Sequence, residues 1–324
     1  MKNKTRAEAY LYASGRIHAM AAHGFTRAEA GRLCDAKTDA EALRVLADAG
    51  IPAADGETAE AALEAARERM LRELSGFLPD ERLPRLFRLR YDYHNIKAAL
   101  KARESFGALY MPAGALSAER VLDAAEHEHY EGLRQEMARG IAEARAAFAR
   151  TGDPQALDFA LDRAMYAEML GLCGEMGSPF AAGFVRLQID AANLLIYVRA
   201  RRLGRGSATL SQALIPGGNA DVTPLLRDTT GDSLERVFGA AFGGVLPAAY
   251  AALERRGSVS ALERLCSEKI AAYVDGGRQT AFGEGVALAY LYRYEAALDQ
   301  IRTILAGKRA GLTPDAIRER LRAL

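Results

Sequence analysis

The chain has 324 residues, of which half are hydrophobic and 26% are charged, with 43 basic and 42 acidic side chains. This length allows a large buried core and two or three domains, and the nearly neutral charge argues against nucleic acid as a main partner. The three cysteines, Cys34, Cys173 and Cys266, have no paired spacing, so they indicate neither a disulfide framework nor a structural zinc site.

The N-terminal segment is charged and lacks the apolar core of a signal peptide, so we expect a cytoplasmic protein. Helix starts are predicted along the chain wherever a capping residue precedes a glutamate by three positions. The four pairs are Thr26 with Glu29, Thr38 with Glu41, Asp232 with Glu235, and Ser260 with Glu263. Pro154 and Pro314 predict two more starts, because the first helical position needs no amide hydrogen.

Between these starts, apolar residues recur every three or four positions, which is the period of a helix with one buried face. One such stripe runs through Leu63, Met70, Leu71, Leu74, Phe77 and Leu78, and another through Ile317, Leu321 and Leu324. Alternating runs of β-branched residues separated by hairpin turns are not found in the sequence. We therefore predict an all-α fold.

One sequence pattern typical of a helix occurs three times, over residues 92–103, 190–201 and, with weaker similarity, 300–308. In this alignment Asn95, Asn193 and Gln300 are equivalent, and each precedes an aliphatic residue, a basic cluster and a glycine. Residues 150–158 also match residues 255–263 without a gap. Such repetition predicts similar structural units, although alanine-rich helices can also resemble one another by chance.

Two loops rich in glycine and proline, residues 105–117 and 214–224, fall near the boundaries that this repeat predicts. We accordingly predict three helical units, residues 1–110, 111–213 and 214–324. The longest uncharged stretch, residues 237–253, is mostly alanine with several glycines, which is too weakly apolar to span a bilayer. We expect a buried helix with a kink at Pro247, and membrane association only through another protein.

Catalytic and cofactor motifs are not found in the sequence. The glycines around Gly283 follow no strand, and Gly307-Lys308 lacks the preceding glycine of a phosphate loop. His127, Glu128 and His129 with Glu126 are adjacent on one predicted helix, so their side chains would diverge rather than hold a metal ion. We predict no metal site and no cofactor.

His94 beside Asp92 could form a proton-transfer pair, but no nucleophile or anion-stabilising loop is evident nearby, so a structural histidine is favoured. The repeated amides could bind a ligand, but backbone bonds at a contact between units are the favoured role. Basic residues near the repeated helix ends either complement the helix dipole, the favoured interpretation, or meet an acidic partner. These possible interface residues are Lys97, Lys101, Arg103, Arg199, Arg201, Arg202, Arg302, Lys308 and Arg309.

The phrases at residues 90–97 and 289–295, continued by residues 301–304 and Gly307-Lys308, resemble the C subunit of V-type and archaeal-type rotary ATPases, called the d subunit in vacuolar enzymes. The opening segment, residues 10–20 with Leu33 and a helix ending at Gly50, is also similar to that family. The resemblance covers essentially the whole chain. It departs at Gln300, where the family usually has asparagine, and residues 118–150 match only in pattern.

The resemblance implies three similar helical units around a pseudo-threefold axis, forming a funnel-shaped collar. It also implies a non-catalytic central-stalk subunit in ATP-linked proton or sodium transport. In that family the wide mouth receives the rotor shaft, made of the D and F subunits, and the opposite end rests on the membrane ring of proteolipid subunits. The protein would then be peripherally attached to the inner face of the membrane through the complex.

Two other functions are possible on the sequence alone. A soluble α-helical scaffold that binds a protein in its concavity would have a similar composition, but units of this length exceed the usual solenoid periods of about 34 to 47 residues. An α-helical enzyme using His94 and Asp92 ranks third. The sequence reveals neither the transported ion nor the working direction of the machine.

Overall fold

The computed structural model describes residues 8–22, 24–54, 56–228, 230–254, 259–319 and 321. Every regular element in these ranges is a helix, which confirms the all-α prediction. The chain separates into two compact units, residues 1–84 with 271–324, and residues 85–270. The finer division into three repeated units stays a prediction.

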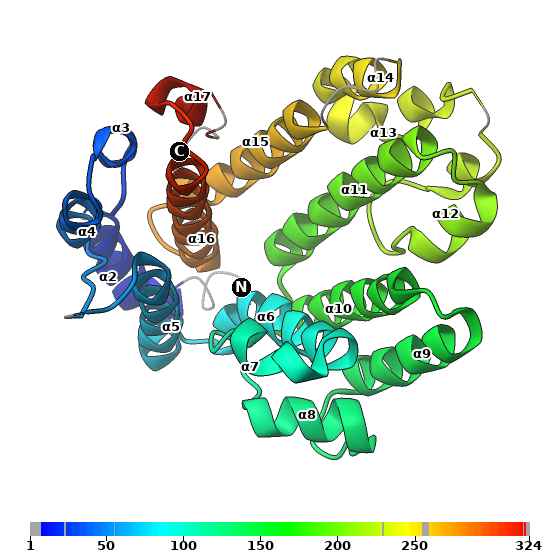
Figure 1. The fold of residues 1–324 in the computed structure, drawn as a ribbon, viewed down its shortest axis with the longest axis horizontal. Coiled ribbons are helices and arrows are strands. Elements are labelled where there is room, and N and C mark those ends of the chain that lie inside the picture. Colours follow the sequence, from blue (N-terminus) through cyan, green and yellow to red (C-terminus); the bar gives the residue numbers. More distant parts are fainter. Residues whose placement is uncertain are drawn as a thin grey trace. The chain divides into compact units, whose positions relative to one another are not determined.

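The first unit brings the two ends of the sequence into one core. It contains α2 (Leu11–Ala21), α3 (Arg27–Asp35), α4 (Asp39–Asp48), α5 (Ala59–Phe77), η4 (Gly277–Gln279), α16 (Glu284–Arg309) and α17 (Pro314–Arg318) (Figure 1). Leu33, Leu46 and Leu63 from its N-terminal helices pack with Ile301 and Ile304 of α16, and all five are fully buried. Burying each such side chain contributes about 1.5–3 kcal/mol, so this core holds α16 against the first helices.

Most of the remaining helices belong to the second unit. They are η1 (Arg103–Ser105), α7 (Phe106–Leu109), α8 (Ala118–His127), α9 (Gln135–Thr151), α10 (Pro154–Met176), α11 (Pro179–Arg202), α12 (Ser207–Ala213), η2 (Thr223–Leu226), α13 (Ser233–Phe242), η3 (Gly243–Val245) and α14 (Leu246–Glu254). Two long helices, α6 (Arg82–Lys101) and α15 (Ser260–Gly276), cross the boundary between the units.

Close helix packing holds the second unit together. A Cβ atom at Gly140 of α9 would lie only 2.4 Å from the Cβ of Ala164 on α10, so these two helices approach as closely as glycine allows. Phe87 of α6 stacks on Phe184 of α11 with ring centroids 6.0 Å apart. Both rings are almost completely buried.

Local signals predicted several helix starts correctly. Thr26 forms the complete capping box with Glu29, and Pro154 and Pro314 occupy first helical positions. Thr38 accepts from the Glu41 amide at 3.2 Å, but the Glu41 carboxylate accepts from the amide before Thr38 instead of closing the box. These contacts lie within four residues of one another, which is why sequence spacing identifies them.

Two predicted caps were wrong. Asp232 precedes α13, but its side chain makes no cap bond: its backbone is already helical, with φ −69° and ψ −16°, and its carboxylate accepts from the Thr230 hydroxyl at 2.6 Å. Helix α15 begins at Ser260 itself, since the Glu263 amide bonds to the Val259 carbonyl oxygen at 2.9 Å and places Ser260 inside the first turn.

The predicted single helix over residues 237–253 is also corrected. The 3-10 turn η3 interrupts it at Gly243, so the bend precedes Pro247, which lies in the first turn of α14. The backbone leaves the helical region at Phe242, with φ −127° and ψ 18°. Among the residues that the structure describes, two stretches are long and apolar enough to cross a membrane, Pro179–Arg202 and Ser233–Glu254, with 67% and 33% of their most apolar windows buried within the protein. Helices in the core of a soluble protein meet the same criteria.

Candidate interface

Two polar side chains on α6 hold the loop of residues 110–117. Asn95 accepts from the Met111 amide at 2.8 Å and donates to the Met111 carbonyl oxygen at 2.9 Å. Asp92 accepts from the amides of Ala115 at 2.7 Å and Leu116 at 2.9 Å. Both side chains are buried, so the loop supplies the hydrogen bonds that they need away from water.

The same arrangement recurs on α11, where it holds the loop of residues 214–222. Asn193 accepts from the Ile215 amide at 2.8 Å and donates to the Ile215 carbonyl oxygen at 2.8 Å. Asp190 accepts from the amides of Asn219 and Ala220, both at 3.1 Å. We call each set, an Asp and an Asn three residues apart with the loop that they hold, a loop clamp.

A glycine completes each loop clamp. A Cβ atom at Gly114 would lie 2.5 Å from Asp92 Oδ1, and one at Gly218 would lie 2.2 Å from Asp190 Oδ1. Any other residue would force the carboxylate to move away from the amides that it binds, so glycine is favoured where the loop crosses it. The equivalent loop segments read Met-Pro-Ala-Gly at residues 111–114 and Ile-Pro-Gly-Gly at residues 215–218.

Burial raises the pKa of the aspartate in the first loop clamp. It raises the pKa of the Asp92 carboxyl to about 6, and the amides of Leu116 and Ala115 oppose part of that rise. His94 Nε2 lies 3.1 Å from the carbonyl oxygen of Leu109. The two members of the candidate proton-transfer pair are therefore both engaged with the backbone of the segment that follows α6.

The third repeat position has a different environment. Gln300 is buried in α16, but the residue three positions earlier is Ala297, where the first two copies have aspartate. In place of a clamped loop, α17 packs against α16, and a Cβ atom at Gly307 would lie 2.9 Å from Cγ1 of Ile317. The structural role of Gln300 as an equivalent of the two asparagines stays a prediction.

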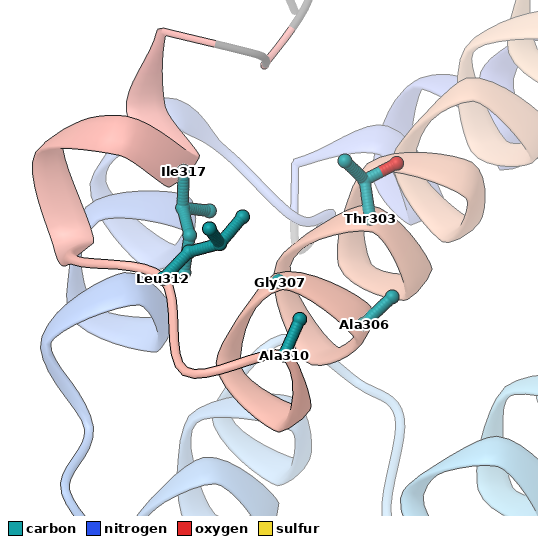
Figure 2. Close-up of a pocket in the computed structure, with 6 residues that line it drawn as sticks. All are labelled: Thr303, Ala306, Gly307, Ala310, Leu312 and Ile317. Atoms are coloured by element: carbon teal, nitrogen blue, oxygen red, sulfur yellow. The ribbon is translucent and has the colours of Figure 1, made fainter.

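A small pocket lies beside this contact between α16 and α17. Figure 2 shows Leu312 and Ile317 on one side of it and residues of α16 on the other. Its volume is about 290 Å³, and its lining is Thr303, Ala306, Gly307, Ala310, Leu312 and Ile317. This lining contains no charged side chain and no group that could act as an acid, a base or a metal ligand.

The basic helix ends mostly pair with acidic side chains on other helices. Lys97 and Lys101 of α6 bond to Asp162 at 2.6 Å and Asp158 at 2.5 Å on α10. Arg103 lies 2.8 Å from Glu126. The structure thus gives these basic residues a third role, ion pairing between helices. It differs from the two roles expected from the sequence, complementing the helix dipole and binding an acidic partner.

The two later copies behave similarly. Their contacts join Arg199 to Glu263, Arg201 to the Asp228 carbonyl oxygen, Arg302 to Glu64, Lys308 to the carbonyl oxygens of Cys34 and Ala36, and Arg309 to Glu60. Arg202 is half-buried at the end of α11. A contact with an acidic partner would compete with these bonds, and that role stays a prediction.

A buried ionic network joins α5 to α16 in the first unit. Arg67 is fully buried, and it donates to Glu295 at 3.0 Å and to Glu64 at 2.5 Å. Arg302 donates to the same Glu64 oxygen at 2.5 Å. Because such a network is satisfied in only one register, it fixes the position of α16 along α5.

A buried carboxylate lies between α6, α9 and α10 in the second unit. Glu168 is fully buried, accepts from the Tyr93 hydroxyl at 2.9 Å, and lies 3.5 Å from Nε of Arg134. Burial raises its pKa to about 7, while the bond from Tyr93 and the charge of Arg134 oppose that rise. Sequence spacing gave no signal for this cluster, because its members come from three separate parts of the chain.

The histidine cluster does not form a metal site in the described part of the chain. Helix α8 ends at His127, Glu128 takes a left-handed conformation with φ 58°, and His129 Nδ1 lies 2.8 Å from Asp123. Among the residues that the structure describes, no group of three possible protein ligands converges on one point.

A family model and several curated proteins that are similar to this chain all indicate the same protein family. The family model described as ATP synthase (C/AC39) subunit matches residues 13–320. The C subunit of the A-type ATP synthase of Thermococcus kodakarensis is 24% identical over 96% of this chain and 89% of its own length. The C subunit of the V-type sodium ATPase of Enterococcus hirae is 23% identical over 81% of each chain. The corresponding A-type C subunit of Haloferax volcanii is 27% identical over 72% of this chain and 71% of its own.

Proposed function

Because this chain belongs to the ATP synthase (C/AC39) subunit family, we propose that it is a non-catalytic rotor subunit that couples the shaft of a V/A-type ATPase to its membrane ring. The observation that carries this proposal is the family match over residues 13–320. Membership makes the chain a subunit of a membrane-associated rotary complex. A scaffold unrelated to any ATPase is thereby ruled out.

The proposed fold is three helical units around a pseudo-threefold axis, forming a funnel. A regular pattern of ion pairs supports it. A basic residue in the C-terminal part of one long helix meets an acidic residue in the first turns of another: α6 with α10, α11 with α15, and α16 with α5. The same kind of pairing between two long helices therefore occurs three times, as three similar units would require.

The contacts of the buried polar residues support the non-catalytic role. Asp92 and Asp190 hold loop amides, and Arg67 and Glu168 join helices. None of these four groups lines the pocket between α16 and α17 described above. We assign them to fixing the shape of the subunit.

Coupling would then be mechanical. The wide mouth would receive the shaft, made of the D and F subunits, and the narrow end would rest on the proteolipid ring at the inner face of the membrane. A densely packed helical body suits this role, because packed interiors have low compressibility and transmit strain. Transport of protons or sodium would be driven by, or would drive, ATP turnover elsewhere in the complex.

Affinity purification of the tagged full chain from detergent-solubilised membranes tests the proposal. We expect the shaft subunits and the proteolipid to co-purify with it. In a strain lacking the chain, ATP-driven ion uptake into membrane vesicles should be lost, and both the native chain and a control with Gln212→Ala, an exposed residue of α12, should restore it. Recovery of the chain without rotary subunits, or ion uptake unaffected by its loss, would refute the proposal.

A further inference from the structure

Glu168 and Arg134 face each other in the second unit without completing a hydrogen bond. Glu168 Oε1 and Arg134 Nε lie 3.5 Å apart, and each of these two atoms is buried without a hydrogen-bond partner. The other carboxyl oxygen of Glu168 accepts from the Tyr93 hydroxyl at 2.9 Å. An unbonded buried donor or acceptor costs free energy, so two that face each other call for an explanation.

The outer end of the Arg134 guanidinium is already bonded. Its Nη1 and Nη2 atoms donate to the carboxylate of Glu175, an exposed residue near the end of α10. A half-buried carboxylate, that of Glu136, lies 3.8 Å from Arg134 Nε. Arg134 therefore lies between one fully buried carboxyl group, that of Glu168, and two that water reaches.

A small movement of Arg134 would complete its bond to Glu168. Moving Nε by about 0.5 Å would bring it within the usual hydrogen-bond distance of about 2.7–3.2 Å. Gly171 of α10 has no side chain beside the guanidinium, and a Cβ atom there would lie 3.8 Å from Arg134 Nη2. Arg134 directly precedes α9, and its carbonyl oxygen accepts from the Ala138 amide at 3.0 Å. A bond to Glu168 would thus tie the start of α9 to α10.

The protonation state of Glu168 determines how strongly it attracts Arg134. A carboxylate accepts strong, charge-assisted bonds from a guanidinium, whereas a neutral carboxyl group attracts it only weakly. Burial raises the pKa of Glu168 to about 7, so this group gains or loses its proton near neutral pH. Burial also raises the pKa of Tyr93, whose hydroxyl therefore remains a donor. The titratable and charged groups that act on Glu168 are Tyr93 and Arg85 of α6, and Arg134 and Glu136 at the start of α9.

We propose that Glu168 and Arg134 form a proton-controlled latch between α10 and the start of α9. When Glu168 is protonated, Arg134 is held by Glu175 at the surface. When Glu168 releases its proton to water, Arg134 Nε donates to Glu168 Oε1 and fixes the first turn of α9 against α10. The latch lies entirely within the second unit, so it goes beyond the proposed coupling role and does not depend on it.

Nuclear magnetic resonance of the purified full chain, with labelled arginine and glutamate side chains, tests the latch across neutral pH. The variant Arg134→Lys, which keeps the charge but lacks the Nε proton, assigns the resonance of that proton. We expect this resonance to move downfield as the pH rises, with a midpoint at about 7 that it shares with the carboxyl carbon of Glu168. Exchange of the Nε proton with water, corrected for the pH dependence of a free guanidinium, should become at least about tenfold slower above the midpoint, because a hydrogen bond to a charged group protects it.

Two variants separate the latch from a general effect of pH. Glu168→Gln should abolish the shift of the Arg134 resonance near pH 7. The control Glu143→Gln removes a different α9 carboxylate, which pairs with Arg163 of α10 at 2.6 Å, and should titrate like the native chain. A native-like shift in Glu168→Gln, or its loss in Glu136→Gln, would overturn the inference, because another carboxylate would then be the acceptor. If Glu168→Gln does not fold, the native chain still decides, since a Glu168 carbon that titrates while the Arg134 proton does not would also refute the latch.

Discussion

Replacement of Asn193 by alanine should destabilise the second unit strongly. Asn193 is 1% exposed and satisfies both the amide and the carbonyl oxygen of Ile215, which is itself 3% exposed. Leaving a buried polar group without a partner costs about 1–3 kcal/mol. Two such groups give an expected loss of about 2–6 kcal/mol in the free energy of unfolding, reduced where water reaches the loop.

Urea unfolding followed by far-ultraviolet circular dichroism measures this loss, fitted for the transition of the unit that contains α11. Limited proteolysis should also cut within residues 214–222 faster in the variant, because the loop has lost its anchor. The control Gln212→Ala, exposed in α12, should change the free energy of unfolding by no more than about 0.5 kcal/mol. An Asn193→Ala midpoint equal to that of the native chain would refute the loop-clamp account.

Three further outcomes are expected. Gly218→Ala should lower the midpoint of the same transition, because its Cβ would lie 2.2 Å from a carboxylate oxygen, whereas Gly206→Ala meets nothing within 4 Å and should not. Arg67→Met should cost about 3–5 kcal/mol, and adding Glu295→Leu should recover much of it in urea unfolding, since the unpaired buried charge is then removed. The raised pKa of Glu168, about 7 in the folded chain, means that its contribution to stability is complete below about pH 4.5 and is lost as the pH rises through 7. Glu168→Gln should therefore flatten the fall in stability between these pH values, and an unchanged slope would contradict the assignment.

Helix formation is the part of this fold that local sequence predicted best. The capping box at Thr26 and the first-turn prolines Pro154 and Pro314 depend on contacts within one turn, which spacing records directly. The error at Asp232 arose because its backbone is already helical and its carboxylate binds the Thr230 hydroxyl, so it makes no cap bond. The error at Pro247 arose because the helix is already interrupted at Phe242, and the proline then lies in the first turn of α14, where its missing amide hydrogen is not needed.

The ion-pair partners of the basic helix ends could not be predicted from composition. Charge clusters at 97–103, 199–202 and 302–309 are visible in the sequence, and both a dipole role and a partner role fit them. Their observed partners include Asp158 and Glu263, which are 57 and 64 residues away in the chain. Only the packing of α6 on α10 and of α11 on α15 brings these charges together.

The amino-acid sequence by itself determined the helical class, the family and the repetition of an amide on three long helices. Helical periodicity and repeated sequence patterns can be recognised from the order of residues along the chain. The tertiary structure decided what that amide does. Asp92 and Asn95, and likewise Asp190 and Asn193, hold loops whose bonded residues lie 16 and 22 positions beyond the asparagine. A buried polar group takes whichever backbone partner packing brings to it, and the distance along the chain does not specify that partner.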